Sequence, residues 1–147
     1  MNYKLIIDST GDEEIIARVH APSALTAAIE NLVNSYTGND SIVVRSGEDV
    51  IKLGFSDVEC ITVIDRKVYA IDKNGDKRRV GTSLSELEAI LPSYFIRINK
   101  SAIANENRIQ MFNTVYSGAV DAVFKCGYKE YVSRRCFREI KRRLGVK

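Results

Sequence analysis

Residues 83–109 read SLSELEAILPSYFIRINKSAIANENRI, and this stretch decides the fold. Ser83 and Glu86 have the spacing of a capping box before an apolar helical face, and Pro92 ends the helix predicted there. The run YFIRI predicts a strand that leads into a polar Asn-Lys-Ser turn at 99–101, and an apolar segment ending in Asn105 follows. The stretch therefore predicts a capped helix, a strand and a tight polar turn.

Short β-branched runs flank this stretch on both sides. Upstream, from Ser41, they read SIVVRS, VIKLG, CITVID, KVYAIDK and KRRVG, and downstream IQMFNTVY, AVDAVFK and YKEYVS. Asn74-Gly75 is a typical hairpin signal between two of them. A basic helix is predicted after Ser133, with Gly145 at its end. The expected fold class is mostly β (α+β), with two or three short helices.

The first 40 residues differ from the rest. Tyr3–Asp8 and Glu14–His20 are β-branched runs around a Ser-Thr-Gly-Asp turn, which predicts a hairpin. From Pro22 onward, apolar residues up to Tyr36 follow helical spacing, and Gly38-Asn39-Asp40 ends the predicted helix. We expect an N-terminal β-β-α appendage at 1–40, with a dimerisation or regulatory role, and a second domain at 41–147.

Charge is distributed unevenly along the chain. Residues 1–60 hold 4 Lys/Arg and 10 Asp/Glu, whereas residues 61–147 hold 18 and 9. A charge asymmetry of this size attracts a polyanion to one end of a protein. A solvated basic helix face would give a similar count, so charge alone leaves both interpretations open.

Enzymatic chemistry has little support in the sequence. The chain has one histidine (His20), three cysteines without CxxC spacing and none of the common nucleotide-binding, zinc-protease or serine-hydrolase motifs. We expect no enzyme, cofactor, metal or small-molecule substrate. The basic run around Cys136 leaves a redox role there as a minor alternative. No secretory signal and no apolar run near 20 residues is found, so we expect a cytoplasmic protein.

Three ordered blocks carry a resemblance to a known family. They are the opening stretch, DVECITVIDRKVYAIDKNGD before it and YVSRRCFREIKRRL after it. Together they resemble the LytTR family of bacterial DNA-binding domains, over about Ser41 to Leu144. The resemblance implies small packed β-sheets with short helices, and loops that enter successive major grooves of DNA. It also implies base contacts by Lys67, Lys100 and Arg135.

A second group is expected to contact the DNA backbone: Arg66, Arg97, Asn99, Ser101, Asn105, Arg108, Ser133 and Arg134. Short polar and basic groups of this kind set register on a duplex without reading sequence. Some have structural alternatives, because Arg97 alternates with isoleucines, Asn105 has the character of a turn cap and Ser133 that of a helix cap. Asn99 stands where the family often has histidine.

The sequence leaves three function classes to compare. The first is a sequence-specific transcription regulator of double-stranded DNA that acts as a homodimer or pairs on repeated half-sites, with a small membrane protein as a conceivable controller. The second is a β-rich RNA-binding module, which needs exposed aromatic side chains among the basic ones. The third is a protein-interaction domain that docks acidic partners.

Overall fold

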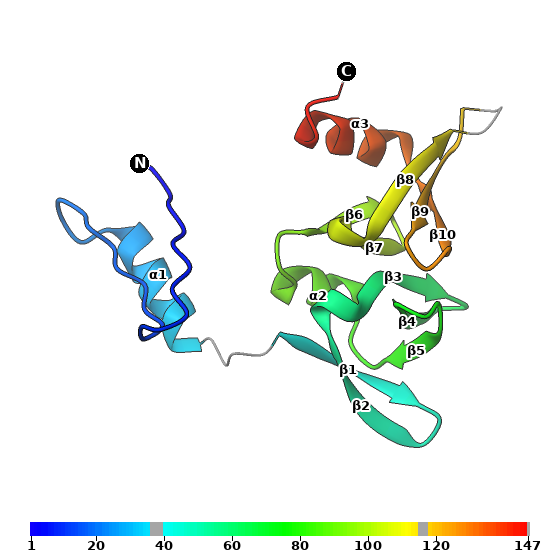
Figure 1. Cartoon of the computed structure of the whole chain (residues 1–147), viewed down its shortest axis with the longest axis horizontal. Coiled ribbons are helices and arrows are strands. Elements are labelled where there is room, and N and C mark those ends of the chain that lie inside the picture. The colour runs from blue at the N-terminus through cyan, green and yellow to red at the C-terminus, as the bar shows by residue number, and fades with distance from the viewer. Residues whose placement is uncertain (36–39, 115–117, 147) are drawn as a thin grey trace. The chain divides into compact units, whose positions relative to one another are not determined.

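A computed structural model of the chain describes residues 1–35, 40–114 and 118–146 (Figure 1). It divides the chain into an N-terminal unit, residues 1–39, and a C-terminal unit, residues 40–147, and this division falls beside the boundary expected after residue 40. Among the described residues, no helix is long and apolar enough to cross a membrane.

The N-terminal unit contains one helix, α1 (Ala24–Ser35). Ser23 begins it, because the backbone N–H of Thr26 donates to the Ser23 hydroxyl and the N–H of Ser23 donates to the Thr26 hydroxyl. Leu25, Ile29 and Leu32 follow helical spacing, as the sequence predicts. The predicted end of this helix, from Tyr36 to Asn39, lies outside the described residues.

The predicted N-terminal hairpin is not formed, which corrects the β-β-α expectation to a helix preceded by two irregular runs. Residues 3–8 and 14–20 belong to no strand. A two-stranded hairpin is marginal in water unless one face packs on a core. No such core exists within this unit, because none of the side chains described in residues 1–34 is buried.

The C-terminal unit is mostly β, as predicted. Its elements are β1 (Ser41–Ser46), β2 (Asp49–Gly54), a 3-10 turn η1 (Phe55–Asp57), β3 (Val58–Ile64), β4 (Lys67–Asp72), β5 (Lys77–Val80), α2 (Leu84–Ile90), β6 (Phe95–Asn99), β7 (Ala102–Asn105), η2 (Glu106–Arg108), β8 (Ile109–Thr114), β9 (Val120–Phe124), β10 (Lys129–Val132) and α3 (Arg134–Arg143). The last two residues of the predicted strand IQMFNTVY lie outside the described residues.

Two antiparallel sheets share these strands (Figure 1). The larger has the order β2-β1-β5-β4-β3-β7-β6, and the smaller has the order β10-β9-β8. β7 pairs with both β3 and β6, but the sequence pattern did not predict it as a strand. β7 has only four residues between a turn and a 3-10 turn, so its pattern is too short to show alternation.

The buried apolar residues form two clusters, and strands of the larger sheet contribute to both. Leu84 and Leu87 of α2 pack with Val58 and Ile61 of β3 in the first cluster. The second lies between the two sheets and beneath α3, where Ile98, Phe124 and Ile140 are buried together. The smaller sheet and α3 are therefore held against the larger sheet mainly by hydrophobic burial.

Strand β6 contains a register shift. Arg97 pairs with Ile103, but Asn99 pairs with the adjacent residue Ala102, so β6 has one extra residue at Ile98. Ile98 is fully buried in the second cluster. A bulge of this kind bends a strand and re-aims the side chains that follow it.

Candidate nucleic-acid interface

The turn between β3 and β4 is a two-residue turn at Asp65 and Arg66. Both residues have positive φ, 50° and 66°, which corresponds to the type I′ geometry that matches the twist of a hairpin. Lys67 follows the turn directly and is the first residue of β4, in agreement with the strand predicted for the run KVYAIDK. The side chains of Arg66 and Lys67 are both exposed at this end of the hairpin.

The turn between β6 and β7 lies at the same end of the larger sheet. It consists of Lys100 and Ser101, and the backbone N–H of Val63 in β3 donates to the Ser101 carbonyl at 2.9 Å. Because β3 and β7 are neighbours, the two turns flank this strand pair.

The start of α3 follows along the same edge. The backbone N–H of Ser133 donates to the carbonyl of Ile98, at the end of β6, at 2.8 Å. Arg134 and Arg135, the first residues of α3, thus lie near the end of β6, which leads into the turn with Lys100. The topology brings the three expected base-contacting residues together in the order Lys67, Lys100, Arg135 along one edge.

The side chains of Lys67, Lys100 and Arg135 are exposed. Among the described residues, these three side chains make no hydrogen bond or ion pair. Lys100 and Arg135 also line the same open groove of about 770 Å³ between β6 and α3. Three unpaired cations on rigid turns and a helix start form a surface suited to an extended polyanion.

Arg97 and Asn99 hold the turn that carries Lys100. The Arg97 guanidinium donates to the carbonyls of Asn99 (2.9 Å) and Lys100 (2.6 Å) and pairs with Glu88 at 2.6 Å. The Asn99 side chain accepts from the Ser101 N–H and donates to the Tyr131 carbonyl, both at 2.6 Å. Both residues, expected to contact the DNA backbone, thus have partners inside the protein.

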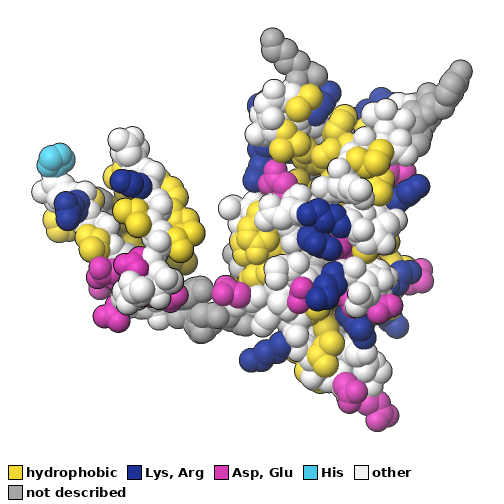
Figure 2. Space-filling model, in the orientation of Figure 1, with side chains coloured by type: hydrophobic (Ala, Val, Ile, Leu, Met, Phe, Trp, Pro, Cys, Tyr) yellow, Lys and Arg dark blue, Asp and Glu magenta, His cyan; other side chains and the backbone are white. Residues whose placement is uncertain are grey.

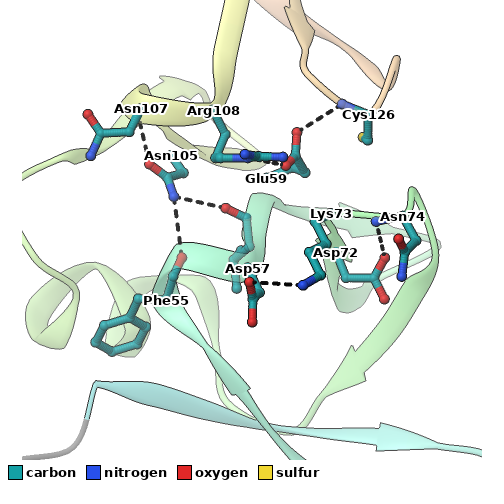
Figure 3. A network of polar contacts seen from close by, with 11 residues as sticks. Phe55, Asp57, Glu59, Asp72, Lys73, Asn74, Asn105, Asn107, Arg108 and Cys126 are labelled. Atoms are coloured by element: carbon teal, nitrogen blue, oxygen red, sulfur yellow. Dashed lines mark hydrogen bonds and ion pairs between the residues drawn. The ribbon is translucent and has the colours of Figure 1, made fainter.

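Asn105 and Ser133 are capping residues. Asn105 is 1% exposed; its amide donates to the carbonyls of Phe55 and Val58, and its oxygen accepts from the Asn107 N–H. This burial leaves Asn105 no surface for a phosphate, which corrects the expectation for this residue (Figure 3). The Ser133 hydroxyl accepts from the Cys136 N–H at 3.2 Å and caps α3.

Arg108 forms an ion pair with a buried carboxylate, a contact that its predicted role at the DNA backbone did not include. Its Nε donates to Oε1 of Glu59 at 2.5 Å, and the other Glu59 oxygen accepts from the Cys126 N–H at 3.3 Å (Figure 3). Glu59 is fully buried in β3, so this contact ties the larger sheet to the start of β8 and to the β9–β10 turn. A carboxylate within the apolar run VECITVI is the sequence feature that indicates such a partner.

Arg66, Ser101 and Arg134 are the other residues expected to contact the DNA backbone. All three side chains are exposed. Arg66 and Arg134 each adjoin one of the three cations in sequence, and Ser101 follows Lys100. Within the second group, these three residues are therefore both exposed and adjacent to a cation of the edge, as a phosphate contact requires.

Burial keeps two thiols protonated. It raises the pKa of the Cys60 thiol well above its ordinary value, and it also raises the pKa of Cys126. Burial and the hydrogen bond to Glu130 raise the pKa of the Tyr128 hydroxyl. No group of three or more metal-ligating side chains is found in the part of the chain that the structure describes. The edge thus offers cationic hydrogen-bond donors.

Comparisons with known proteins agree with this architecture. The LytTr DNA-binding domain family matches residues 48–145. Two uncharacterized HTH-type transcriptional regulators of Staphylococcus aureus, from strains NCTC 8325 and MSSA476, are each 32% identical to this chain over 148 residues, with 99% of both chains covered.

A solved structure shows the same fold. The LytTr DNA-binding domain of a response regulator from Bacillus cereus superposes with a TM-score of 0.65 and 24% identity, over 72% of this chain and 97% of that one. A helix-turn-helix needs two consecutive helices joined by a short turn. Within the described residues of this chain, five strands separate α2 from α3. From the match over residues 48–145, the chain belongs to the LytTr DNA-binding domain family.

Proposed function

We propose that this protein is a bacterial, cytoplasmic transcription regulator that binds double-stranded DNA sequence-specifically through Lys67, Lys100 and Arg135. The observation that carries the proposal is that these three cations are exposed, unpaired and consecutive along one edge. Lys and Arg donate to the O6 and N7 acceptors of guanine in the major groove. The protein acts as a binding protein and not as an enzyme.

The spacing of the turns refines how the duplex is engaged. The β3–β4 and β6–β7 turns lie two strand spacings apart, roughly 10 Å. Successive major grooves on one face of a duplex are about 34 Å apart. Lys67 and Lys100 are too close together to serve successive major grooves by themselves. Lys67 and Arg135 are the outer pair along the edge, because Ser133 bonds to the end of β6. We propose that this outer pair enters successive major grooves, with Lys100 over the segment between them.

The remaining polar residues divide into two roles. Arg66, Ser101 and Arg134 contact phosphates beside the three cations. Arg97, Asn99, Arg108, Asn105 and Ser133 act indirectly, because each already holds a turn, a cap or an ion pair within the protein. Replacing a residue of the indirect set then changes the geometry of the edge without removing a phosphate contact.

The test is binding of the full chain to a selected duplex, followed by fluorescence anisotropy at several salt concentrations. Lys67→Ala, Lys100→Ala and Arg135→Ala should each weaken binding to the selected site by about 1–3 kcal/mol, roughly 5- to 150-fold. Lys77→Ala is the matched control, because Lys77 is an exposed first residue of β5 at the opposite end of the β4–β5 hairpin.

A modified DNA distinguishes base contacts from general attraction between charges. Replacing guanines of the site with 7-deazaguanine removes the N7 acceptor, so it should weaken the wild-type protein and leave the Arg135→Ala variant nearly unaffected at the contacted base. Equal loss in all variants, Lys77→Ala included, would refute the assignment. Equal affinity for single-stranded RNA would favour an RNA-binding module instead.

Regulation by paired sites completes the proposal. Specific DNA-binding proteins often use two half-sites related by symmetry or repetition. We expect this chain to bind as a homodimer or as two copies on repeated half-sites. A small membrane protein as its controller stays a prediction, tested by co-purification from detergent extracts.

A further inference from the structure

The N-terminal unit has no core of its own. None of the side chains described in residues 1–34 is buried, and only those of Thr26 and Ile29 are half-buried. Ten large apolar side chains between Tyr3 and Val33 are 42–87% exposed. In Figure 2 hydrophobic side chains form a yellow stripe along one side of this unit, with smaller yellow patches elsewhere on it. Apolar surface of this extent on a soluble chain marks an interaction site.

The usual internal stabilisers of small units are lacking in this sequence. Units below about 40 residues generally need a disulfide, a metal or an oligomer partner. Residues 1–39 contain no cysteine and a single potential metal-ligating histidine, His20. Burial of its apolar side chains against another protein surface is the stabiliser that remains.

Two extended runs of this unit also have unused backbone groups. Residues 3–7 and 14–19 make no hydrogen bond within the described chain, either in a strand or in a turn. Both runs are rich in isoleucine, a residue type favoured in strands. Unpaired, β-prone backbone is the surface that pairs edge to edge with a second chain.

We infer that the N-terminal unit is a self-association surface, and that a second copy of this chain covers its apolar stripe. A buried aliphatic or aromatic side chain removes roughly 100 Å² from water, so ten partly exposed ones can bury on the order of 700 Å². A standard stable interface buries about 800 Å² per partner. The exposed apolar surface therefore matches the requirement of a dimer.

Charge argues against a membrane as the occupant. Residues 1–39 hold two Lys/Arg and five Asp/Glu. An acidic surface is repelled by anionic lipid headgroups, whereas amphipathic segments that bind bilayers are typically basic. The S. aureus relatives cover the same full length, so a unit of this position is present in them as well.

The inference rests on the paired DNA binding proposed above and assigns a surface to it. Its first test needs no DNA. Sedimentation equilibrium of the full chain should give twice the 16.5 kDa mass of one copy. Ile6→Asp and Ile16→Asp should weaken the dimer at least tenfold. Val50→Asp is the matched control, because Val50 of β2 is 64% exposed, close to the 66% of Ile16.

A conservative variant at Ile6 and the DNA binding of Ile6→Asp complete the test of the self-association surface. Ile6→Val should keep the dimer, because the side chain stays apolar. This result would show that the introduced charge, and not the change of residue itself, disrupts the interface in Ile6→Asp. Ile6→Asp should bind a single half-site with unchanged affinity but lose cooperativity on two half-sites. A monomeric wild type, a dimer unaffected by the aspartates, or a monomer that co-sediments with vesicles of neutral or anionic lipid would overturn the inference. A dimer that does not bind DNA would refute the proposed function alone.

Discussion

Removing the buried carboxylate of Glu59 should destabilise the C-terminal unit strongly while leaving its DNA contacts intact. Glu59 is 0% exposed and lies in β3, between Arg108 and the β9–β10 turn. Glu59→Ala leaves the Arg108 guanidinium without its anionic partner and the Cys126 N–H without an acceptor. The substitution therefore tests how much the ionic contact between the two sheets contributes.

The expected magnitude follows from the burial of each partner. Breaking a buried ion pair by removing one partner costs about 3–5 kcal/mol. The side chain of Arg108 is 28% exposed, so water solvates it partly once Glu59 is gone, and the cost falls to the lower end, about 3 kcal/mol. Each 1.4 kcal/mol is a factor of ten in the unfolding equilibrium, so the unfolded fraction rises roughly a hundredfold.

Urea unfolding followed by circular dichroism measures this cost, since the chain has no tryptophan. Glu59→Gln keeps the volume and one acceptor, so it should cost less than Glu59→Ala. The double variant Glu59→Leu with Arg108→Met should recover most of the loss, because an apolar pair replaces the ionic one without leaving an unpaired charge.

The same variants separate two roles for Arg108. If Arg108 only pairs with Glu59, Arg108→Met lowers stability but leaves the dependence of DNA affinity on salt unchanged. A phosphate contact would instead lower the slope of log K against log salt by about 0.9. A Glu59→Ala variant that loses less than about 1 kcal/mol, or an Arg108→Met variant with a lower salt slope, would refute the reasoning.

Three further outcomes follow from the structure. Arg66→Gly should stabilise the hairpin by about 0.5 kcal/mol in thermal unfolding, because glycine accepts the positive φ of the type I′ turn, and it should weaken DNA binding by losing a cation. Ser133→Ala should cost about 1 kcal/mol in urea unfolding by removing the cap of α3, with no change in salt slope. Alkylation of Cys126 by iodoacetamide should speed up only above its ordinary pKa of 9.0, because the thiolate reacts and burial raises the pKa; a half-maximal rate below that pH would contradict this.

The C-terminal unit was largely readable from local patterns. The capping box at Ser83 predicted α2, the run after Ser133 predicted α3, and β-branched runs predicted most strands, because each pattern depends on residues close in sequence. The short strand β7 was missed since four residues carry no period. The N-terminal hairpin was predicted wrongly because strand propensity does not reveal whether a core is available to cover the strands.

The candidate site shows a similar division. The Asn-Lys-Ser turn that holds Lys100 and the helix start that holds Arg135 were predictable, because turn and cap residues are recognisable in sequence. The choice of Lys67, Lys100 and Arg135 came from the family resemblance. Their order along one edge was not predictable, since it depends on β7 lying between β3 and β6. The partners of Arg97, Asn99 and Arg108 were also hidden, because each contact joins or positions elements that sequence spacing does not place together.

The extra residue at Ile98 has a consequence for how members of this family should be compared. Side chains alternate between faces along a strand, so one inserted residue reverses that alternation for everything between it and the next turn. Deleting the codon of Ile98 would keep the net charge and every polar and basic residue of the interface. It would nevertheless aim the lysine of the following turn at the opposite face. A family alignment must therefore preserve the number of residues between the start of the strand and that lysine, as well as the lysine itself.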